Sequence, residues 1–139
     1  MRNEADLNPL LVLLARLALG AIFVLSGWGK LHGFEGFAAS LNNRGVPAAQ
    51  IFAVLGVAAE LGGGLAVVLG VMTRHAALLM IVFIVVATGI AHRYWEVSDA
   101  AAHAQQMTNF MKNLSMLGGF LLLLATGGGK LSLDKMFRK

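Results

Sequence analysis

The chain has 139 residues, of which 58% are hydrophobic and only 13% are charged, and its mean hydropathy is +0.74. A soluble domain usually contains roughly 45–50% apolar and about 25% charged residues. A soluble fold of this length could not cover so much apolar surface, so the composition excludes one. We therefore expect a single domain, residues 1–139, that is embedded in a lipid bilayer.

The net charge of +4 and the isoelectric point near 10.0 do not indicate a nucleic-acid-binding protein, because the basic residues are scattered singly. The C-terminal group directly follows an apolar segment, which favours contact with anionic lipid headgroups. The absence of cysteine excludes a disulfide, an iron–sulfur cluster and a thiolate metal site within this chain. Any thiol chemistry must belong to a partner.

Four segments are apolar over the length that a membrane helix requires, about 20 residues. They are residues 10–29, 51–72, 76–94 and 107–126. We therefore predict an all-α, integral membrane four-helix bundle. The first segment is long and is preceded by Glu4 and Asp6, which favours a retained helix over a cleavable signal peptide.

Glycine and proline mark the expected boundaries of these segments. Pro9 suits the first turn of a helix, the sequence Gly-Val-Pro at 45–47 breaks the chain, and three glycines at 127–129 end the fourth segment. We expect a tight turn at 72–75 and a short loop or surface helix at 96–106.

The distribution of basic residues predicts the orientation in a bacterial inner membrane. Four crossings place both termini and the turn at 72–75 on one side, and six basic residues lie there against three on the other side. Because the cytoplasmic side of a membrane protein carries the excess of Lys and Arg, we expect cytoplasmic termini. The six are Arg2, Arg74, Lys130, Lys135, Arg138 and Lys139, and the three are Lys30, Arg44 and Arg93.

Polar residues recur on one face of each predicted helix. The first segment has such a face at spacings of four and three residues, formed by Arg16, Gly20, Phe23, Gly27 and Lys30. The second repeats the pattern with Gly56, Glu60, Gly63, Val67 and Gly70. Glu60 lies about 13 Å along the helix from Ile51, near the middle of the bilayer, and the small residues predict close contact with another helix.

The third and fourth segments carry polar residues near their outer ends. These are Thr88 and His92 in the third, and Asn109, Lys112 and Asn113, followed by Met116, in the fourth. We expect the four faces to converge on a polar pocket that opens toward the outer leaflet. The predicted lining is Lys30, Glu60, His92, Asn109, Lys112 and Asn113, with Arg16 deeper.

The residues leave alternatives open for each member of this set. Glu60 is either a proton-titrating or ligand-binding carboxylate, or the structural partner of Arg16 or Lys112. For Arg16 we favour structural pairing with Glu60 over contact with a lipid phosphate. Lys112 is either a ligand contact or an interface anchor.

A metal or haem site is not predicted at His92. The other three histidines, His32, His75 and His103, lie in loops or at the ends of segments, so an ordinary hydrogen-bonded histidine is favoured. The methionines of the fourth segment are assigned to packing. Motifs of soluble enzymes such as GxxxxGK[ST], GxSxG and HExxH are absent.

Several stretches together resemble the DoxX family. They are RLALGAIFVLSGWGKLHGF, the Gly-Val-Pro turn, AELGGGLAVVLGVMTR, TGIAH and NFMKNLSMLGG, and they extend over nearly the whole chain. The resemblance implies a small four-helix bacterial membrane protein, related to DoxD-like proteins that form the membrane part of thiosulfate:quinone oxidoreductase, and a partner of redox enzymes. The family's recurrent polar positions correspond to Arg16, Lys30, Glu60, Arg74, His92, Asn109, Lys112 and Asn113.

Our leading hypothesis is a membrane subunit or accessory of a redox system that binds a quinone-like or other small lipophilic molecule and docks a redox-enzyme partner. Glu60 would be the catalytic residue that handles a proton, while Lys112, Asn109 and Asn113 hold a carbonyl or anionic group. One alternative is a proton-coupled carrier, expected to form a homodimer. Another is a structural membrane anchor for a partner protein.

Overall fold

The computed structural model describes residues 7–137, which form helices joined by short turns and no strand. This confirms the predicted all-α fold class. In chain order the elements are α1 (Pro9–His32), α2 (Phe34–Asn43), α3 (Ala49–Val57), η2 (Ala58–Gly62), α4 (Gly63–Leu69), α5 (Thr73–Ala91), η3 (Tyr94–Glu96), α6 (Ala100–Thr126) and α7 (Leu133–Met136).

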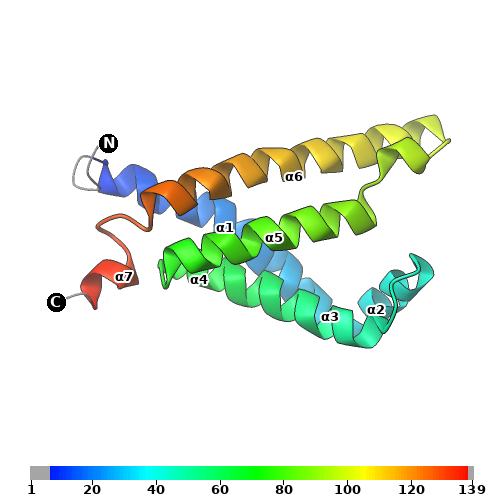
Figure 1. Cartoon of the computed structure of the whole chain (residues 1–139), viewed down its shortest axis with the longest axis horizontal. Helices are drawn as coiled ribbons and strands as arrows, with labels where there is room; N and C mark the ends of the chain where they lie inside the picture. The colour runs from blue at the N-terminus through cyan, green and yellow to red at the C-terminus, as the bar shows by residue number, and fades with distance from the viewer. Residues whose placement is uncertain (1–6, 138–139) are drawn as a thin grey trace.

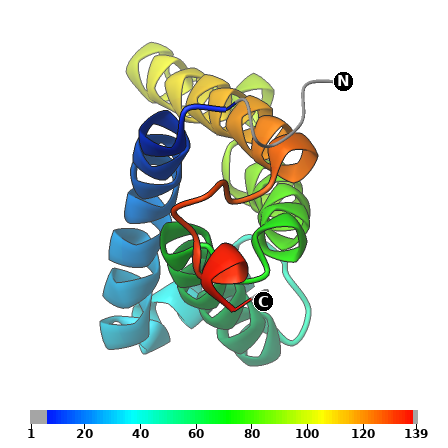
Figure 2. The same cartoon turned by 90° about the vertical axis from the view of Figure 1, so that its left-hand side faces the viewer.

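Four helical runs extend along the length of the molecule (Figure 1). They are α1, the continuous run of α3, η2 and α4, then α5, and finally α6. The beginning of α1, the end of α6 and α7 lie together, at what we call the termini end, and α2 and η3 lie at the opposite loop end. In Figure 2, which looks along the molecule from the termini end, α1 lies on the left, α6 crosses the top, α5 lies on the right, and the α3–α4 run lies below between α1 and α5.

Three of these runs are long and apolar enough to cross a membrane: Pro9–His32, Ala49–Leu69 and Thr73–Glu96. The chain is thus a helical membrane protein. Helix α6 has 27 residues, which at about 1.5 Å per residue is ample length, but polar residues in its first half lower its hydropathy. The fourth crossing, predicted at 107–126, therefore stays a prediction.

Two predicted boundaries were wrong by a few residues. The second segment ends at Leu69 and not at 72, because Gly70 adopts a left-handed conformation (φ 71°) and Val71 N–H donates back to Ala66 O at 2.9 Å. The tight turn accordingly lies at 70–72. Residues 100–106 belong to α6, whose first turn is capped by the Asp99 carboxylate.

A glycine seam joins α1 to the second helical run. The buried residues of α1 are Arg16, Gly20, Phe23 and Gly27, as the spacing predicted. A methyl group added at Gly64 would lie 2.9 Å from Phe23 Cβ, and one added at Gly27 would lie 2.9 Å from Leu61 Cβ. The two backbones therefore approach as closely as glycine permits, as in small-xxx-small packing.

Aromatic and aliphatic side chains fill the centre of the bundle. The Phe23 ring of α1 lies 5.6 Å from the Phe120 ring of α6 and 6.3 Å from the Phe83 ring of α5. Val67 and Met80 are completely buried beside them. Large apolar side chains also cover the outside of the long helices, as expected where lipid is the solvent.

Arg16 joins three segments at the termini end. Its side chain is fully buried, and its guanidinium donates to Val68 O at 3.4 Å and to Leu131 O. Any side chain at Gly70 would collide with that guanidinium, so glycine is required there for space as well as for its positive φ. Arg16 thus connects α1 to the end of α4 and to the segment that leads into α7.

Asp134 of α7 caps the beginning of α5. Its carboxylate accepts hydrogen bonds from Met72 N–H at 2.6 Å, Thr73 N–H at 2.8 Å and Thr73 Oγ1 at 2.7 Å. Met72 has a positive φ of 44°, which is unfavourable for a side chain of this size, and the bond to Asp134 holds it there. The negative charge of the Asp134 carboxylate also attracts the buried, positively charged guanidinium of Arg16.

The glycine seam predicts that Gly64→Ala destabilises the bundle, because the new methyl group would force α1 away from α4. We expect a loss of about 1–3 kcal/mol in the free energy of unfolding. Gly62→Ala is the matched control: it lies two residues away and has open space at its Cβ position. Thermal unfolding in mild detergent measures both, and equal melting temperatures for the two variants would contradict the seam.

The cap predicts that Asp134→Ala costs about 2 kcal/mol, since three donors and the turn before α5 lose a charged acceptor. Asp99→Ala removes a cap that accepts a hydrogen bond from Ala102 N–H alone among the described residues, and it should cost less. Amide exchange at Met72 and Thr73 is the sharper measurement. Unchanged protection of these two amides in Asp134→Ala would show that the carboxylate does not hold the turn.

Candidate functional site

A single ion pair lies between α1 and the π-helical turn η2. Lys30 Nζ and Glu60 Oε2 are 2.5 Å apart, and the side chains are 31% and 4% exposed respectively. Glu60 is the only acidic residue among the buried polar residues of the described range. The pair therefore combines a shielded carboxylate with an ammonium group that reaches the surface of the bundle.

Local structure in both helices brings these two residues together. Gly27 packs directly on the backbone of Leu61, so α1 passes very close to η2, and Lys30 follows one turn later. Ala53, Val57 and Glu60 are buried on one face of the second helical run, and the helix widens into π-type turns at η2, where Glu60 lies. Such π-bulges occur frequently at functional sites.

Helix α2 brings an aromatic ring to the same place. Lys30 Nζ lies 5.1 Å from the centroid of the Phe37 ring, a cation–π distance. Helix α2 folds back against α3 at the loop end (Figure 1). The ammonium thus has Glu60 as one partner and the Phe37 ring as another, and both reduce the unfavourable transfer of its charge from water.

A second polar pair lies between α5 and α6. Asn113 is buried, and its Nδ2 donates to Thr88 Oγ1 at 2.8 Å. A buried amide needs such a partner in a membrane, where water cannot supply one. The predicted inward orientation of Asn113 is therefore confirmed, with Thr88 as its partner.

The two polar pairs lie at similar depth in the bundle. Phe23 of α1 and Met80 of α5 both pack against adjacent glycines at the start of α4, which places them at one level. From there Lys30 lies seven residues and Thr88 eight residues toward the loop end, about 10 and 12 Å. However, no hydrogen bond or ion pair joins the two pairs in the described part of the chain.

The remaining predicted site residues lie outside the two pairs. His92, at the end of α5, is half-buried and shares a 2.8 Å hydrogen bond between its Nδ1 and Gln106 Oε1. Asn109 is half-buried on α6. Lys112 is exposed, so the expectation that it faces inward was wrong, because α6 packs through Asn113, Phe120 and Leu123 instead.

Arg16 does not pair with Glu60, which corrects the favoured sequence interpretation. Its partners are backbone carbonyl groups at the termini end, and the cation beside Glu60 is Lys30. Spacing along α1 places both cations on one face, and only the depth of Glu60 on the facing helix decides between them. The sequence shows neither the π-helical turn nor the packing of Gly27 on Leu61, so it does not give the depth of Glu60 relative to α1.

Sequence reasoning also missed several partners. Phe37 lies on α2, between the predicted segments 10–29 and 51–72, where no helix was predicted. Gln106 lies in a stretch that was predicted as a loop or surface helix. The alternation of apolar and polar residues in FEGFAASLNN could have indicated α2. The hydrogen bond that Thr73 Oγ1 donates to Asp134 joins residues 61 positions apart, so no local sequence pattern predicts it.

Two cavities lie away from the ion pair, and neither is the predicted outer pocket. One, of about 560 Å³, lies between α2 and α3 and includes Glu35 and Gln50 in its lining. The other, of about 230 Å³, lies at the termini end beside Thr73 and Asp134. Within the described residues, no group of three or more His, Asp or Glu side chains could hold a metal ion.

The chain is similar over most of its length to known inner membrane proteins. It is 38% identical over 128 residues to inner membrane protein YphA of Escherichia coli strain K12, covering 92% of this chain and 91% of that protein. It is 36% identical over 128 residues to inner membrane protein YqjF of the same strain, covering 92% of each.

A further relative is the uncharacterized membrane protein Rv3486 of Mycobacterium tuberculosis, 30% identical over 146 residues, covering 95% of this chain and 84% of that protein. No solved structure matches significantly. The DoxX family model matches residues 11–93, a range that contains the α1–η2 contact, Lys30 and Glu60. The chain therefore belongs to the DoxX family.

Proposed function

We propose that this protein is an inner-membrane subunit or accessory of a redox system, in which the Lys30–Glu60 pair binds the polar head of a small, quinone-like lipophilic molecule. One observation carries the proposal: a carboxylate that is 4% exposed lies in a π-helical turn, paired with a lysine that is 31% exposed. Ionisable side chains within membrane segments are rare and usually serve a function.

The chemistry of the pair suits a carbonyl ligand. An ammonium group has three N–H donors, of which Glu60 takes one, so Lys30 can also donate to a quinone carbonyl oxygen. When a partner enzyme supplies the electrons that reduce the quinone, the Lys30 ammonium would donate a proton to the reduced oxygen. Glu60, which accepts a hydrogen bond from Lys30, would then take up a proton and pass it to the resulting amine.

Access to the pair follows from its position. Lys30 is in the last turn of α1, near the loop end, and apolar side chains cover the surrounding outer surfaces of the helices. A lipophilic molecule can therefore reach the ammonium laterally from the bilayer, with its ring beside Phe37. The loop end, with α2 and η3, is the surface on which we place the redox partner.

Glu60→Gln should weaken binding of decylubiquinone about tenfold. The substitution removes the negative charge that accepts a hydrogen bond from Lys30, and the amide cannot carry a proton. Trp28 is two residues from Lys30 and 57% exposed, so quenching of its fluorescence reports the bound quinone. The measurement uses a Trp95→Phe background, which leaves Trp28 as the only tryptophan.

Glu35→Gln is the matched control, since it makes the same change at an exposed carboxylate outside the pair. Its quinone affinity should equal that of the parent. Equal affinities in Glu60→Gln and Glu35→Gln would remove Glu60 from the site. If quinone binding is unaffected but proton-coupled flux in empty liposomes is lost in Glu60→Gln, the carrier hypothesis replaces this one.

The double variant Lys30→Met/Glu60→Leu separates ligand binding from helix packing. Replacing a buried ion pair by apolar residues is often neutral or stabilising, so the melting temperature in detergent should not fall. Decylubiquinone quenching and the redox enzyme that co-purifies from native membranes should both be lost. A stable double variant that keeps both would identify the pair as purely structural and the protein as an anchor.

A further inference from the structure

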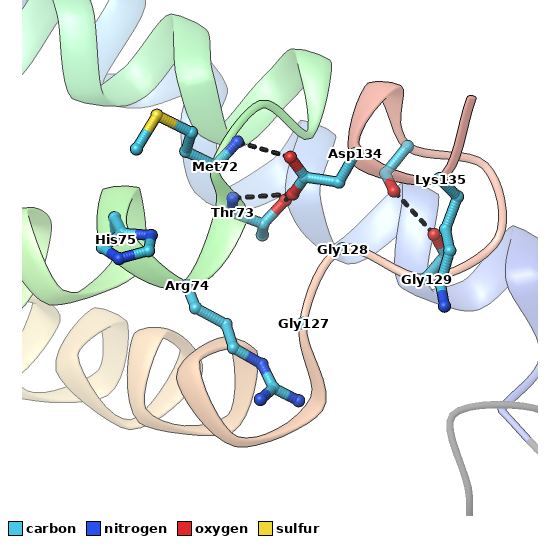
Figure 3. Close-up of a pocket in the computed structure, with 10 residues that line it drawn as sticks. Met72, Thr73, Arg74, His75, Gly127, Gly128, Gly129, Asp134 and Lys135 are labelled. Atoms are coloured by element: carbon cyan, nitrogen blue, oxygen red, sulfur yellow. Dashed lines mark hydrogen bonds between the residues drawn. The ribbon is translucent and has the colours of Figure 1, made fainter. Parts of the chain in front are cut away.

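The cavity of about 230 Å³ lies at the termini end of the bundle, away from the Lys30–Glu60 pair. It is formed where the first turn of α5, the glycine loop at 127–129 and α7 meet (Figure 3). A methyl group added at Gly128 would lie 2.9 Å from Ser132 Cβ, so the loop is packed firmly against α7. A liquid water occupies about 30 Å³, so the cavity has room for a group several times larger.

Two basic side chains, those of Arg74 and Lys135, line this cavity together with one carboxylate, that of Asp134, so its formal charge is positive. Arg74 and Lys135 lie on either side of the glycine loop in Figure 3, and His75 also contributes to the lining. Arg74 is held in place by a 3.3 Å bond to Ala125 O at the end of α6. The carboxylate of Asp134 faces the wall of the cavity, where Met72 and Thr73 donate to it.

The position of the cavity matches the headgroup level of a bilayer. Helix α5 is apolar enough to span a membrane and begins at Thr73, so residues 73–75 mark the edge of the hydrocarbon layer. Large apolar side chains lie exposed beside the cavity on the same elements. Met136 and Phe137 next to Lys135 are 69% and 82% exposed, and Met72 next to Thr73 is also exposed.

Cations beside exposed apolar side chains distinguish a lipid from a free anion, because only a lipid offers a negative headgroup and acyl chains together. We propose that this cavity is a binding site for the phosphate of an anionic phospholipid. Arg74 and Lys135 hold the phosphate oxygens, and Met72, Met136 and Phe137 lie along the acyl chains. The site is independent of the proposed quinone site, which lies toward the opposite end of the bundle.

The test is native mass spectrometry of the full chain, purified in mild detergent and incubated with either phosphatidylglycerol or phosphatidylcholine. The unsubstituted protein should retain phosphatidylglycerol in preference. Arg74→Gln/Lys135→Gln should reduce that retention on the order of tenfold, since each cation contributes to the attraction of an anionic headgroup. Lys135→Gln alone should give an intermediate loss, and because it lies on an exposed short helix it keeps the test valid if Arg74→Gln does not fold.

Lys130→Gln is the matched control, because Lys130 is exposed at the same end but does not line the cavity. It should retain phosphatidylglycerol within about twofold of the parent. Equal losses in Lys130→Gln and Lys135→Gln would overturn the proposal in favour of unspecific attraction to the basic end. Displacement of the lipid by inorganic phosphate at equal concentration would also overturn it, because the site would then recognise a free anion.

Discussion

The close contact of α1 with the second helical run is the constraint on which the rest of the structure depends. At Gly27 and Gly64 the backbones touch almost without intervening side chains, and the Phe23 ring fills the space beside them. In lipid there is little hydrophobic drive for helices to associate, so such van der Waals contact must supply it. The contact also determines which cation of α1 reaches Glu60, because it fixes the relative depth of the two helices.

The π-helical turn adds a second constraint to the same contact. Ala53, Val57 and Glu60 lie at spacings of four and three residues, so one face of the helical run is buried up to and through η2. Glu60 lies on this face within the wider turn and is directed at α1, where Lys30 neutralises it. Single π-type turns within α-helices are rare and occur frequently at functional sites.

The two ends of the bundle differ in how charge is used. At the termini end, Arg16 and Asp134 are held by backbone groups and tie α1, α4, α5 and α7 into one unit. Toward the loop end, Lys30 and Glu60 bond mainly to each other, and Lys30 keeps contact with the surroundings. One end is thus held together by bonds between charged side chains and backbone groups, whereas at the other end a partly exposed cation reaches the surface, as the proposed ligand site requires.

Much of this could be predicted from the sequence because it depends on local chemistry. Hydropathy indicated the helical membrane fold, three glycines ended the last long helix at Thr126, and the spacing of residues identified the buried face of α1. It also placed Glu60 and Asn113 in the interior, because a carboxylate or an amide cannot face lipid without a partner. These features require only the period of a helix and the polarity of its solvent.

The partners of the polar residues depended on the tertiary structure. That Glu60 pairs with Lys30 and not Arg16, that Lys112 faces outward, and that Asp134 caps α5 all depend on relative helix depth and rotation. A shift of one residue rotates a helical position by about 100°, and the sequence does not mark the rotation or depth of one helix relative to its neighbour. The sequence by itself therefore determined the helical membrane fold and the buried face of α1, because these depend on local polarity and helical period. The packing of one helix against another decided that Lys112 faces outward and which of the buried residues meet.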